Sequence, residues 1–307
     1  MENANHMLGA TKVESNRAGF VALVGKPNVG KSTLMNALLE QRLSIVTSKP
    51  QTTRQRVLGI LTKNKTQVLF LDTPGLLEPQ YRLQEYMLQS ALQTMNDTDM
   101  AVAIIDAPRF THCLDEQFIN FLKHCRGPII LAINKIDKIS KDSLLPMIKQ
   151  AKESFPFTDI VPISALKQDG LAPLLDAIIR LLPIGPALYP EDMLTAQPER
   201  FFVSEIIREH LFFALHDELP YALAVFVESF TDRPNGTAFI QANIIIERSS
   251  QKSIVIGKSG NMLKHIGTSA RKAIEDFLDR SIYLDLQVKV RPSWRKKEHE
   301  LKKLGYT

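Results

Sequence analysis

An eight-residue pattern near the start of the chain restricts the fold more than any other feature. Residues 25–32 read GKPNVGKS, which matches G-x-x-x-x-G-K-[ST]. An apolar run, FVALV, precedes the pattern, and apolar residues at helical spacing follow it at Leu34, Ala37 and Leu38. This strand–loop–helix context is the one that a phosphate-binding loop requires. We expect the backbone N–H groups of the loop and of the following helix to bind phosphate oxygens.

More apolar runs follow in the N-terminal half, separated by helical patterns. They read VLFL at 68–71, AVAII at 101–105 and IILAI at 129–133. Runs that are apolar at every position are typical of parallel strands covered by helices on both faces. Strands that alternate with helices indicate a doubly wound sheet. We therefore predict an α/β domain with a mostly parallel sheet over residues 18–185, closing with a helix at 171–182.

A second, smaller domain is predicted after this one, because 307 residues suffice for about two domains of ordinary size. Helix-breaking residues cluster at the end of the first domain and just after it, namely Pro183, Gly185, Pro186 and Pro190. They predict a linker at 186–198, and residues 1–17 are expected to form a polar N-terminal tail. Residues 199–307 show the order α-β-β-α-α-β, with helices at 200–216 and 262–280 and strands at 221–230, 238–247 and 282–290. This order predicts an α+β domain.

Composition excludes several classes of protein. The chain is 44% hydrophobic and 23% charged, as ordinary globular domains are. No apolar run approaches the roughly 18 residues of a transmembrane helix, and residues 1–17 lack the apolar region of a secretory signal. Cys113 and Cys125 are too few for a disulfide framework and fit a cytoplasmic location.

Polar segments at two further places predict a magnesium site beside the phosphate loop. Residues 72–75 read DTPG and follow the strand at 68–71. A carboxylate there can help to hold the metal, and the N–H of Gly75 can meet a terminal phosphate. A threonine in the polar loop around residues 51–54 can complete the metal shell when a γ-phosphate is present. Thr53 is the preferred ligand, and Thr52 is the alternative.

Two more strand ends predict recognition of a guanine base. Residues 134–137 read NKID and follow the strand at 129–133. The carboxylate of Asp137 can accept two hydrogen bonds from guanine, and adenine lacks that donor pair. Residues 164–166, which read SAL, follow a strand expected at 160–163 and can support the base through backbone N–H groups. Ligands gather at the carboxyl edge of an open α/β sheet, where all these segments would meet.

The predicted nucleotide site therefore combines four segments and a loop. Lys31, Thr53, Asp72 and Gly75 are assigned to catalysis, and the hydroxyls of Ser32 and Thr53 are assigned to Mg²⁺. The predicted nucleotide-binding residues are Gly25, Lys26, Pro27, Asn28, Val29, Gly30, Lys31, Ser32, Thr33, Thr52, Thr53, Asp72, Thr73, Pro74, Gly75, Asn134, Lys135, Asp137, Ser164, Ala165 and Leu166.

The charge of the C-terminal domain is distributed unevenly. Residues 191–247 hold 3 Lys/Arg and 10 Asp/Glu, whereas residues 248–307 hold 14 and 6. The net charges are thus −7 and +8, and the basic part indicates a face for an anionic partner. Within it, residues 257–260 read GKSG between two helical segments, and this resembles the G-x-x-G backbone clamp of KH domains.

The predicted RNA-binding residues surround this tetrapeptide and extend to the basic end of the chain. They are Ile256, Gly257, Lys258, Ser259, Gly260, Lys264, Arg271, Lys272, Arg291 and Trp294. Trp294 has two interpretations of about equal weight. It could stack on a base, or it could be a packing anchor.

Residues 18–185 resemble the translation-factor-related P-loop GTPases through the four motifs above, and the C-terminal domain has the element order of a type II KH domain. Together they resemble a family of bacterial ribosome-assembly GTPases. The resemblance implies binding of GTP or GDP with Mg²⁺, binding of 16S rRNA near its 3′ end, and a role in maturing the small (30S) ribosomal subunit. It also implies a monomer in the cytoplasm with some peripheral contact with the inner membrane.

The resemblance also bears on the rate of hydrolysis. Many relatives carry a water-orienting Gln directly after the D-x-x-G glycine, but here Leu76 and Leu77 follow. We expect slow intrinsic hydrolysis. Asn28 stands where potassium-dependent members of this class carry their ion-binding Asn, so K⁺ could stand in for an arginine finger. The alternative is that Asn28 only stabilises the turn.

Other functions remain open at this point. A metabolic phosphotransferase would not need the N-K-x-D segment, and comparing GTP with ATP binding would identify one. A membrane-associated GTPase could use the basic C-terminus on anionic lipid. A tRNA-modification-related GTPase is a further alternative, although such relatives usually carry a C-terminal Cys or a modification domain.

Overall fold

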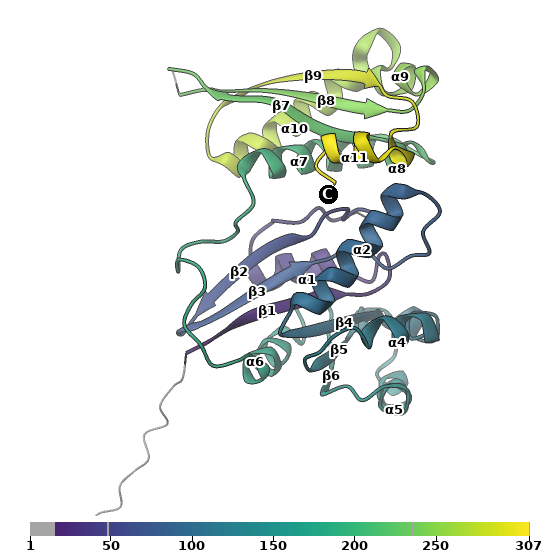
Figure 1. Cartoon of the computed structure of the whole chain (residues 1–307), viewed down its shortest axis with the longest axis vertical. Helices are drawn as coiled ribbons and strands as arrows, with labels where there is room; N and C mark the ends of the chain where they lie inside the picture. The colour runs from purple at the N-terminus through teal and green to yellow at the C-terminus, as the bar shows by residue number, and fades with distance from the viewer. Residues whose placement is uncertain (1–15, 48, 235, 307) are drawn as a thin grey trace, which may run out of the picture.

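The computed structural model describes residues 16–47, 49–234 and 236–306. It contains a six-stranded sheet of order β2-β3-β1-β4-β5-β6 and a three-stranded sheet of order β7-β8-β9. Figure 1 shows the two sheets stacked along the long axis of the molecule. The predicted fold class is confirmed. Most of the predicted tail at 1–17 lies outside the described residues, but Arg17 already belongs to the first strand.

The strands of the N-terminal domain are β1 (Arg17–Val24), β2 (Val57–Lys63), β3 (Thr66–Asp72), β4 (Met100–Asp106), β5 (Ile129–Asn134) and β6 (Asp159–Pro162). β2 pairs antiparallel with β3, and the other neighbours in this sheet pair in parallel. Every residue of β3, β4 and β5 is buried, as expected for strands covered on both faces.

The helices of this domain are α1 (Lys31–Leu39), α2 (Arg82–Asp97), α3 (Phe110–Cys113), α4 (Glu116–Leu122), α5 (Leu144–Ser154) and α6 (Leu171–Leu181). In Figure 1, α1 lies behind the sheet and α2 lies in front of it. Helix α1 begins at Lys31, directly after the glycine of the phosphate loop. The sequence therefore passes from strand to loop to helix where the pattern predicted it.

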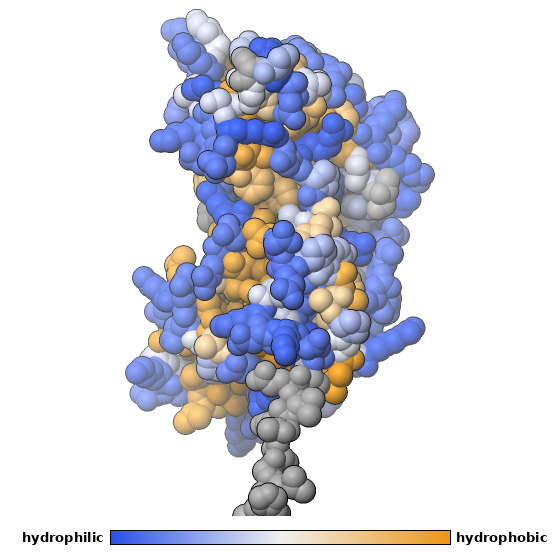
Figure 2. All heavy atoms as spheres, turned by 90° about the vertical axis from the view of Figure 1, so that its left-hand side faces the viewer, coloured by the Kyte–Doolittle hydropathy of each residue, from blue (hydrophilic) through white to orange (hydrophobic). Residues whose placement is uncertain are grey.

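The segment at 186–198 lies against the edge of the first sheet. The N–H of Ile60 on β2 donates to Leu194 O at 2.8 Å, and the side chain of Gln67 on β3 accepts from the N–H groups of Leu188 and Tyr189 at 2.7 and 2.9 Å. These contacts cover an edge strand that would otherwise expose unpaired backbone groups. Figure 2 views the molecule from this side and shows hydrophobic residues gathered between the two domains.

The elements of the C-terminal domain are α7 (Glu199–Ala214), α8 (Leu219–Ala222), β7 (Ala224–Asp232), β8 (Ala238–Ile246), α9 (Ser249–Ile256), α10 (Asn261–Leu278), β9 (Ile282–Val290) and α11 (Glu298–Lys303). β7 and β8 pair antiparallel, and β8 and β9 pair in parallel. Figure 1 shows α7 and α10 on the face of this sheet that points toward the N-terminal domain.

The strand predicted to begin at residue 221 begins at Ala224, because the preceding residues form α8. Pro220 stands in the first turn of that helix, where its missing N–H costs no hydrogen bond. Pro234 and Gly236 predict a turn between β7 and β8, and residue 235 of that turn lies outside the described residues. Within the described part of the chain, no helix has the length and apolar character needed to cross a membrane.

The prediction that Trp294 could stack on a base is wrong in this structure. Its exposed fraction is 0%, its indole N–H donates to Ala222 O at 2.9 Å, and its ring stacks on Tyr306 with centroids 6.2 Å apart. It shares a hydrophobic cluster with Leu83 and Met87 of α2. Trp294 is therefore an anchor that packs the C-terminal segment between the two domains.

Candidate nucleotide and RNA sites

The predicted nucleotide-binding segments surround one cavity of about 520 Å³. The predicted residues that line it are Pro27, Asn28, Gly30, Lys31, Ser32, Thr33, Thr52, Thr53, Gly75, Asn134, Lys135, Asp137, Ala165 and Leu166. Its other lining residues were not predicted, and these are Ile45, Val46, Thr47, Gln51, Asp106, Arg109 and Lys138. The predicted residues that do not line it are Gly25, Lys26, Val29, Asp72, Thr73, Pro74 and Ser164. The volume is in the range of small-molecule sites.

Three oxygen-bearing side chains converge beneath the phosphate loop. The hydroxyl of Ser32 donates to Asp72 Oδ2 at 2.6 Å and lies 3.0 Å from the hydroxyl of Thr53. Thr53 also donates to Asp72 Oδ2, at 3.3 Å. Among the described residues, Asp72 Oδ1 has no hydrogen-bond partner although it is buried. Hydroxyls beside a buried carboxylate with unused acceptor capacity fit a magnesium ion.

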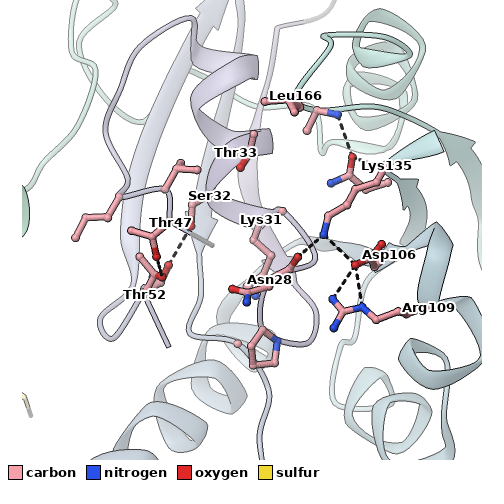
Figure 3. A pocket seen from close by; sticks show the side chains of 18 of the residues that line it. Asn28, Lys31, Ser32, Thr33, Thr47, Thr52, Asp106, Arg109, Lys135 and Leu166 are labelled. Carbon is pink, nitrogen blue, oxygen red and sulfur yellow. Dashed lines mark hydrogen bonds and ion pairs between the residues drawn. The ribbon is translucent and has the colours of Figure 1, made fainter. Parts of the chain in front are cut away.

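The two candidate threonines differ in their surroundings. The hydroxyl of Thr52 lies 2.8 Å from that of Thr47 (Figure 3). It also donates to Lys49 O at 2.7 Å. It therefore takes part in the fold of its own loop, whereas Thr53 points to Ser32 and Asp72. The geometry favours Thr53, the preferred ligand, over Thr52.

Lys31 is positioned at the centre of the phosphate loop. Its ammonium group donates to the carbonyl oxygens of Gly25 and Lys26, both at 3.1 Å. Burial lowers the pKa of Lys31 to about 8, although the charge of Asp72 opposes this shift. Burial also raises the pKa of Asp72, and Lys31 opposes that shift in turn. The phosphates of a bound triphosphate would supply negative charge next to this buried ammonium group and would stabilise its protonated form.

The other lysine of the loop points away from the cavity. The ammonium group of Lys26 donates to His112 O at 2.6 Å and forms an ion pair with Asp115, the N-cap residue of α4. Only the backbone of Lys26 thus belongs to the phosphate loop. Its side chain attaches the loop to α3 and to the N-cap of α4.

Close contacts with neighbouring segments explain two glycines. Gly30 has φ 102°, and a Cβ atom there would lie 2.3 Å from Asn134 Nδ2. A Cβ atom on Gly75 would lie 2.9 Å from backbone atoms of Pro27. Side chains at these positions would push apart the segments that form the cavity, which is the physical reason for glycine there.

The segment at 134–137, which is predicted to recognise the base, is hydrogen-bonded to the phosphate loop. Asn134 donates to Val29 O at 2.8 Å and accepts from Ala165 N at 3.0 Å. Lys135 reaches across the cavity to Asn28 O at 2.7 Å and to Asp106 at 2.9 Å, as Figure 3 shows. These contacts join the end of the cavity formed by the phosphate loop to the end formed by residues 134–137.

Asp137, the residue predicted to recognise guanine, lines the same cavity. It accepts a hydrogen bond of 2.5 Å from the hydroxyl of Ser164, which orients its carboxylate. The exposed Leu166 lies near Lys135 at the mouth of the cavity (Figure 3). The paired Asp106 and Arg109 were not predicted, because neither stands in a motif and they meet only through the end of β4 and the turn after it.

The glycine tetrapeptide at 257–260 forms a tight turn between α9 and α10. Gly257, Ser259 and Gly260 have φ values of 74°, 52° and 78°. A cavity of about 390 Å³ lies beside this turn, between α10 and β9. Its lining residues are Gly260, Leu263, Lys264, Gly267, Thr268, Arg271, Leu284 and Leu286. A positively charged groove with an apolar floor suits single-stranded RNA.

The remaining predicted RNA-binding residues lie around this groove or away from it. Lys258 and Lys272 are exposed, and Ile256 is half-buried. Arg291 forms an ion pair of 2.9 Å with Glu300, so part of its charge is engaged within the domain. Trp294 is buried against Ala222, α2 and Tyr306, as described above.

Comparisons with known proteins extend this picture. A family described as 50S ribosome-binding GTPase matches residues 20–135, and the KH domain family matches residues 218–295. The chain is similar to the GTPase Era of Ruminiclostridium cellulolyticum, with 44% identity over 95% of this chain and 98% of that protein. It is similar also to the GTPase Era of Geotalea uraniireducens, with 43% identity over 94% and 98%.

Two solved structures are similar over nearly the whole chain. One is a single-residue variant of Aquifex aeolicus Era bound to GDP·AlF4⁻, with TM-score 0.91 and 41% identity. The other is Era in complex with MgGDPNP and nucleotides 1506–1542 of 16S ribosomal RNA, with the same TM-score and identity. Each comparison covers 95% of this chain and 99% of the other.

Proposed function

The chain belongs to the Era family of GTPases, and from this premise we propose that it binds and hydrolyses GTP in the cavity and binds 16S rRNA near its 3′ end through the KH domain. A relative of 41% identity binds MgGDPNP and nucleotides 1506–1542 of 16S ribosomal RNA. The observation that carries the proposal is that the phosphate loop, Gly75 and Asp137 line one cavity.

We propose that the phosphates lie along the loop with Lys31 between the β- and γ-phosphates. Ser32 and Thr53 would ligate magnesium, with Asp72 behind them at 2.6 Å from Ser32. When bound, Mg²⁺ neutralises the charge that develops on the phosphate oxygens. Thr53 would engage only when a γ-phosphate is present, so its loop reports which nucleotide is bound.

We propose that Asp137 selects guanine. Its carboxylate, held by Ser164, would accept hydrogen bonds from the guanine N1–H and amino group. Titration of the purified chain with fluorescent (mant) derivatives of GTP and ATP tests this proposal. We expect saturable, magnesium-dependent binding of mant-GTP. The affinity for mant-ATP should be lower by at least about a hundredfold. Equal affinity for the two nucleotides would contradict it.

Intrinsic hydrolysis is proposed to be slow and stimulated by K⁺. Leu76, which follows Gly75, is half-buried and packs against the hydrophobic core, so it cannot orient water. The cation would lie at Asn28, which has φ 64° in the phosphate loop. Hydrolysis rates in KCl and in NaCl test this role, and equal rates would remove it.

RNA binding is proposed at the groove beside Gly257–Gly260. Crosslinking and sequencing of bound RNA from cells should recover the 3′ end of 16S rRNA. A double variant, Gly257→Asp with Gly260→Asp, should lose this RNA because carboxylates repel the phosphate backbone. Unchanged RNA capture by that variant would defeat the assignment.

We also propose that the chain is a monomer that acts in the cytoplasm on precursors of the small ribosomal subunit, with a fraction at the surface of the inner membrane. The basic residues of 248–307, with their net charge of +8, would provide the contact with anionic lipid. Cell fractionation with sucrose gradients of ribosomal particles tests both locations. Absence of the chain from small-subunit fractions would contradict the first.

A further inference from the structure

The loop that carries Thr53 is fastened to the C-terminal domain on one side by Arg54. This arginine has an exposed fraction of 2%. Its guanidinium group donates to the backbone carbonyls at the end of α8, at 2.6 Å to Leu223, 3.2 Å to Pro220 and 3.3 Å to Tyr221. Among the described residues, no carboxylate forms an ion pair with Arg54, so neutral carbonyls stabilise its charge.

Two more cations, Arg208 and Lys49, attach the part of the same loop that precedes Thr53 to α7. Arg208 of α7 is buried and donates to the carbonyl oxygen of Thr52. The ammonium group of Lys49 donates to two carbonyls at the end of α7, those of Phe212 and Leu215. Carbonyls at a helix C-terminus carry partial negative charge and lack partners within the helix. The loop therefore supplies cations to the ends of α7 and α8.

Thr53 lies between these attachments. The residue before it is held through its backbone carbonyl and the residue after it through its side chain, both by the C-terminal domain. The hydroxyl of Thr53 points in the other direction, 3.0 Å from Ser32 and 3.3 Å from Asp72. With its backbone held on both sides, this side chain has little freedom apart from its rotamer.

We infer that Arg54 is a positioning residue, which uses the backbone of the KH domain to hold Thr53 in place as a magnesium ligand. The inference rests on the proposed function, in which Thr53 ligates the metal beside GTP. Mg²⁺ demands near-ideal octahedral geometry, so a ligand on a loose loop would bind it weakly. The KH domain thereby completes the nucleotide site.

The burial of Arg54 makes this attachment cooperative. A buried charge without its hydrogen bonds is costly, so the guanidinium group either keeps its carbonyl partners or returns to water. Partial separation of the loop from α8 is unfavourable for the same reason. We therefore expect the attachment to form or to be lost as a whole, and its loss would release Thr53 from its place beside Ser32 and Asp72.

The experiment measures the Mg²⁺ concentration that gives half-maximal binding of mant-GDPNP by the full chain and by Arg54→Met. We expect the variant to need about tenfold more Mg²⁺, as for other residues that orient metal ligands. Its affinity for mant-GDP should change by less than about twofold, because Thr53 does not engage GDP. Arg56→Met is the matched control, since Arg56 is an exposed arginine of the same loop, and its Mg²⁺ requirement should stay that of the unaltered chain.

A double-mutant cycle with Thr53→Val separates positioning from general destabilisation. If Arg54 acts through Thr53, adding Arg54→Met to Thr53→Val changes the Mg²⁺ requirement by less than about twofold. Arg54→Lys keeps the charge but loses the several N–H donors of the planar guanidinium group. Its Mg²⁺ requirement should lie between those of the parent chain and Arg54→Met. Arg54→Lys replaces Arg54→Met if that variant does not fold.

Two results would overturn the inference and can be told apart. An unaltered Mg²⁺ requirement in Arg54→Met, with intact binding by the parent chain, would overturn the positioning role alone. Additive effects of Arg54→Met and Thr53→Val would do the same. Absence of magnesium-dependent mant-GDPNP binding by the parent chain would overturn the proposed function, and this inference with it.

Discussion

The ammonium group of Lys135 lies 2.9 Å from the carboxylate of Asp106. The same group donates to Asn28 O at 2.7 Å, so it joins the end of β4 to the phosphate loop. Asp106 also forms an ion pair with Arg109 at 2.7 Å. The carboxylate thus holds two cations at the side of the cavity, and it is itself nearly inaccessible to water.

We predict that Asp106→Asn weakens binding of GTP and GDP alike. The amide keeps the size of the side chain but loses the charge that holds Lys135, and hydrogen bonds to charged groups contribute about 1.5–3 kcal/mol. The expected loss of affinity is about tenfold or more. Titrations with mant-GTP and mant-GDP measure it, and Asp142→Asn, at an exposed position, is the control. Unchanged affinity would show that Asp106 is not needed to place Lys135.

We predict that GTP affinity falls as the pH rises through about 8, the pKa that burial gives Lys31. In the chain without nucleotide, Lys31 loses its proton above that pH because its pKa is lowered. A bound triphosphate favours the protonated, charged form of Lys31. Binding at higher pH must then take up a proton, and affinity at pH 9 should be about tenfold below that at pH 7.

Lys31→Arg provides the control for this pH dependence, because its guanidinium group stays charged over the same range. Its GTP affinity should be nearly independent of pH between about 7 and 9, whatever its absolute value. Isothermal titration in buffers of different ionisation enthalpy counts the protons taken up. Equal pH dependence in Lys31→Arg and the parent chain would assign the effect to another group.

We predict that Asp137→Asn shifts the preference of the site from guanine to xanthine nucleotides. The amide N–H of the new Asn would face the exocyclic amino group of guanine, which is also a donor. Xanthine carries a carbonyl at the same position, and this carbonyl can accept from the amide. GTP affinity should fall at least about a hundredfold, whereas XTP affinity should rise. Competition of GTP and XTP against mant-GDP measures both. A fall in affinity for both nucleotides would indicate a structural role for Asp137.

We predict that Trp294→Ala destabilises the chain without a matching loss of RNA affinity. Removing a buried tryptophan costs about 3–5 kcal/mol, because a cavity remains between α2 and the C-terminal segment. Urea unfolding followed by circular dichroism measures the free energy of unfolding. Trp294→Phe, at a temperature where it is folded, should bind the RNA within about twofold of the parent chain. A large loss of RNA affinity in Trp294→Phe would restore the base-stacking role.

The motifs of the nucleotide site were predictable because their chemistry depends on residues close together in sequence. Gly30, Lys31 and Ser32 stand together at the start of α1, and Asp72 is the last residue of β3. The shared carboxyl edge of a parallel sheet then brings such turns together. Local pattern and fold class suffice for this part of the site.

The contacts between the domains were not predictable in this way. Arg54 reads as one more arginine in a polar loop, and its carbonyl partners lie 166 to 169 residues further along the chain. Backbone carbonyls leave no signature in a sequence. Trp294 is a similar case, because only the packing of α2 against the C-terminal segment decides between its two interpretations. Strand β2 was not predicted. Its apolar residues begin at Val57, directly after the polar loop around residues 51–54, so the pattern does not mark where the strand starts.

We propose that guanine nucleotide in the cavity controls RNA binding by the KH domain, because the C-terminal domain holds both neighbours of Thr53. The most direct measurement is the affinity of the purified chain for an RNA that corresponds to nucleotides 1506–1542 of 16S rRNA, the segment bound by a relative of 41% identity, in the presence of Mg·GDPNP and of Mg·GDP. We predict tighter binding with Mg·GDPNP, and loss of the difference in Thr53→Val. Equal affinity with the two nucleotides, or no binding of this RNA, would contradict the account.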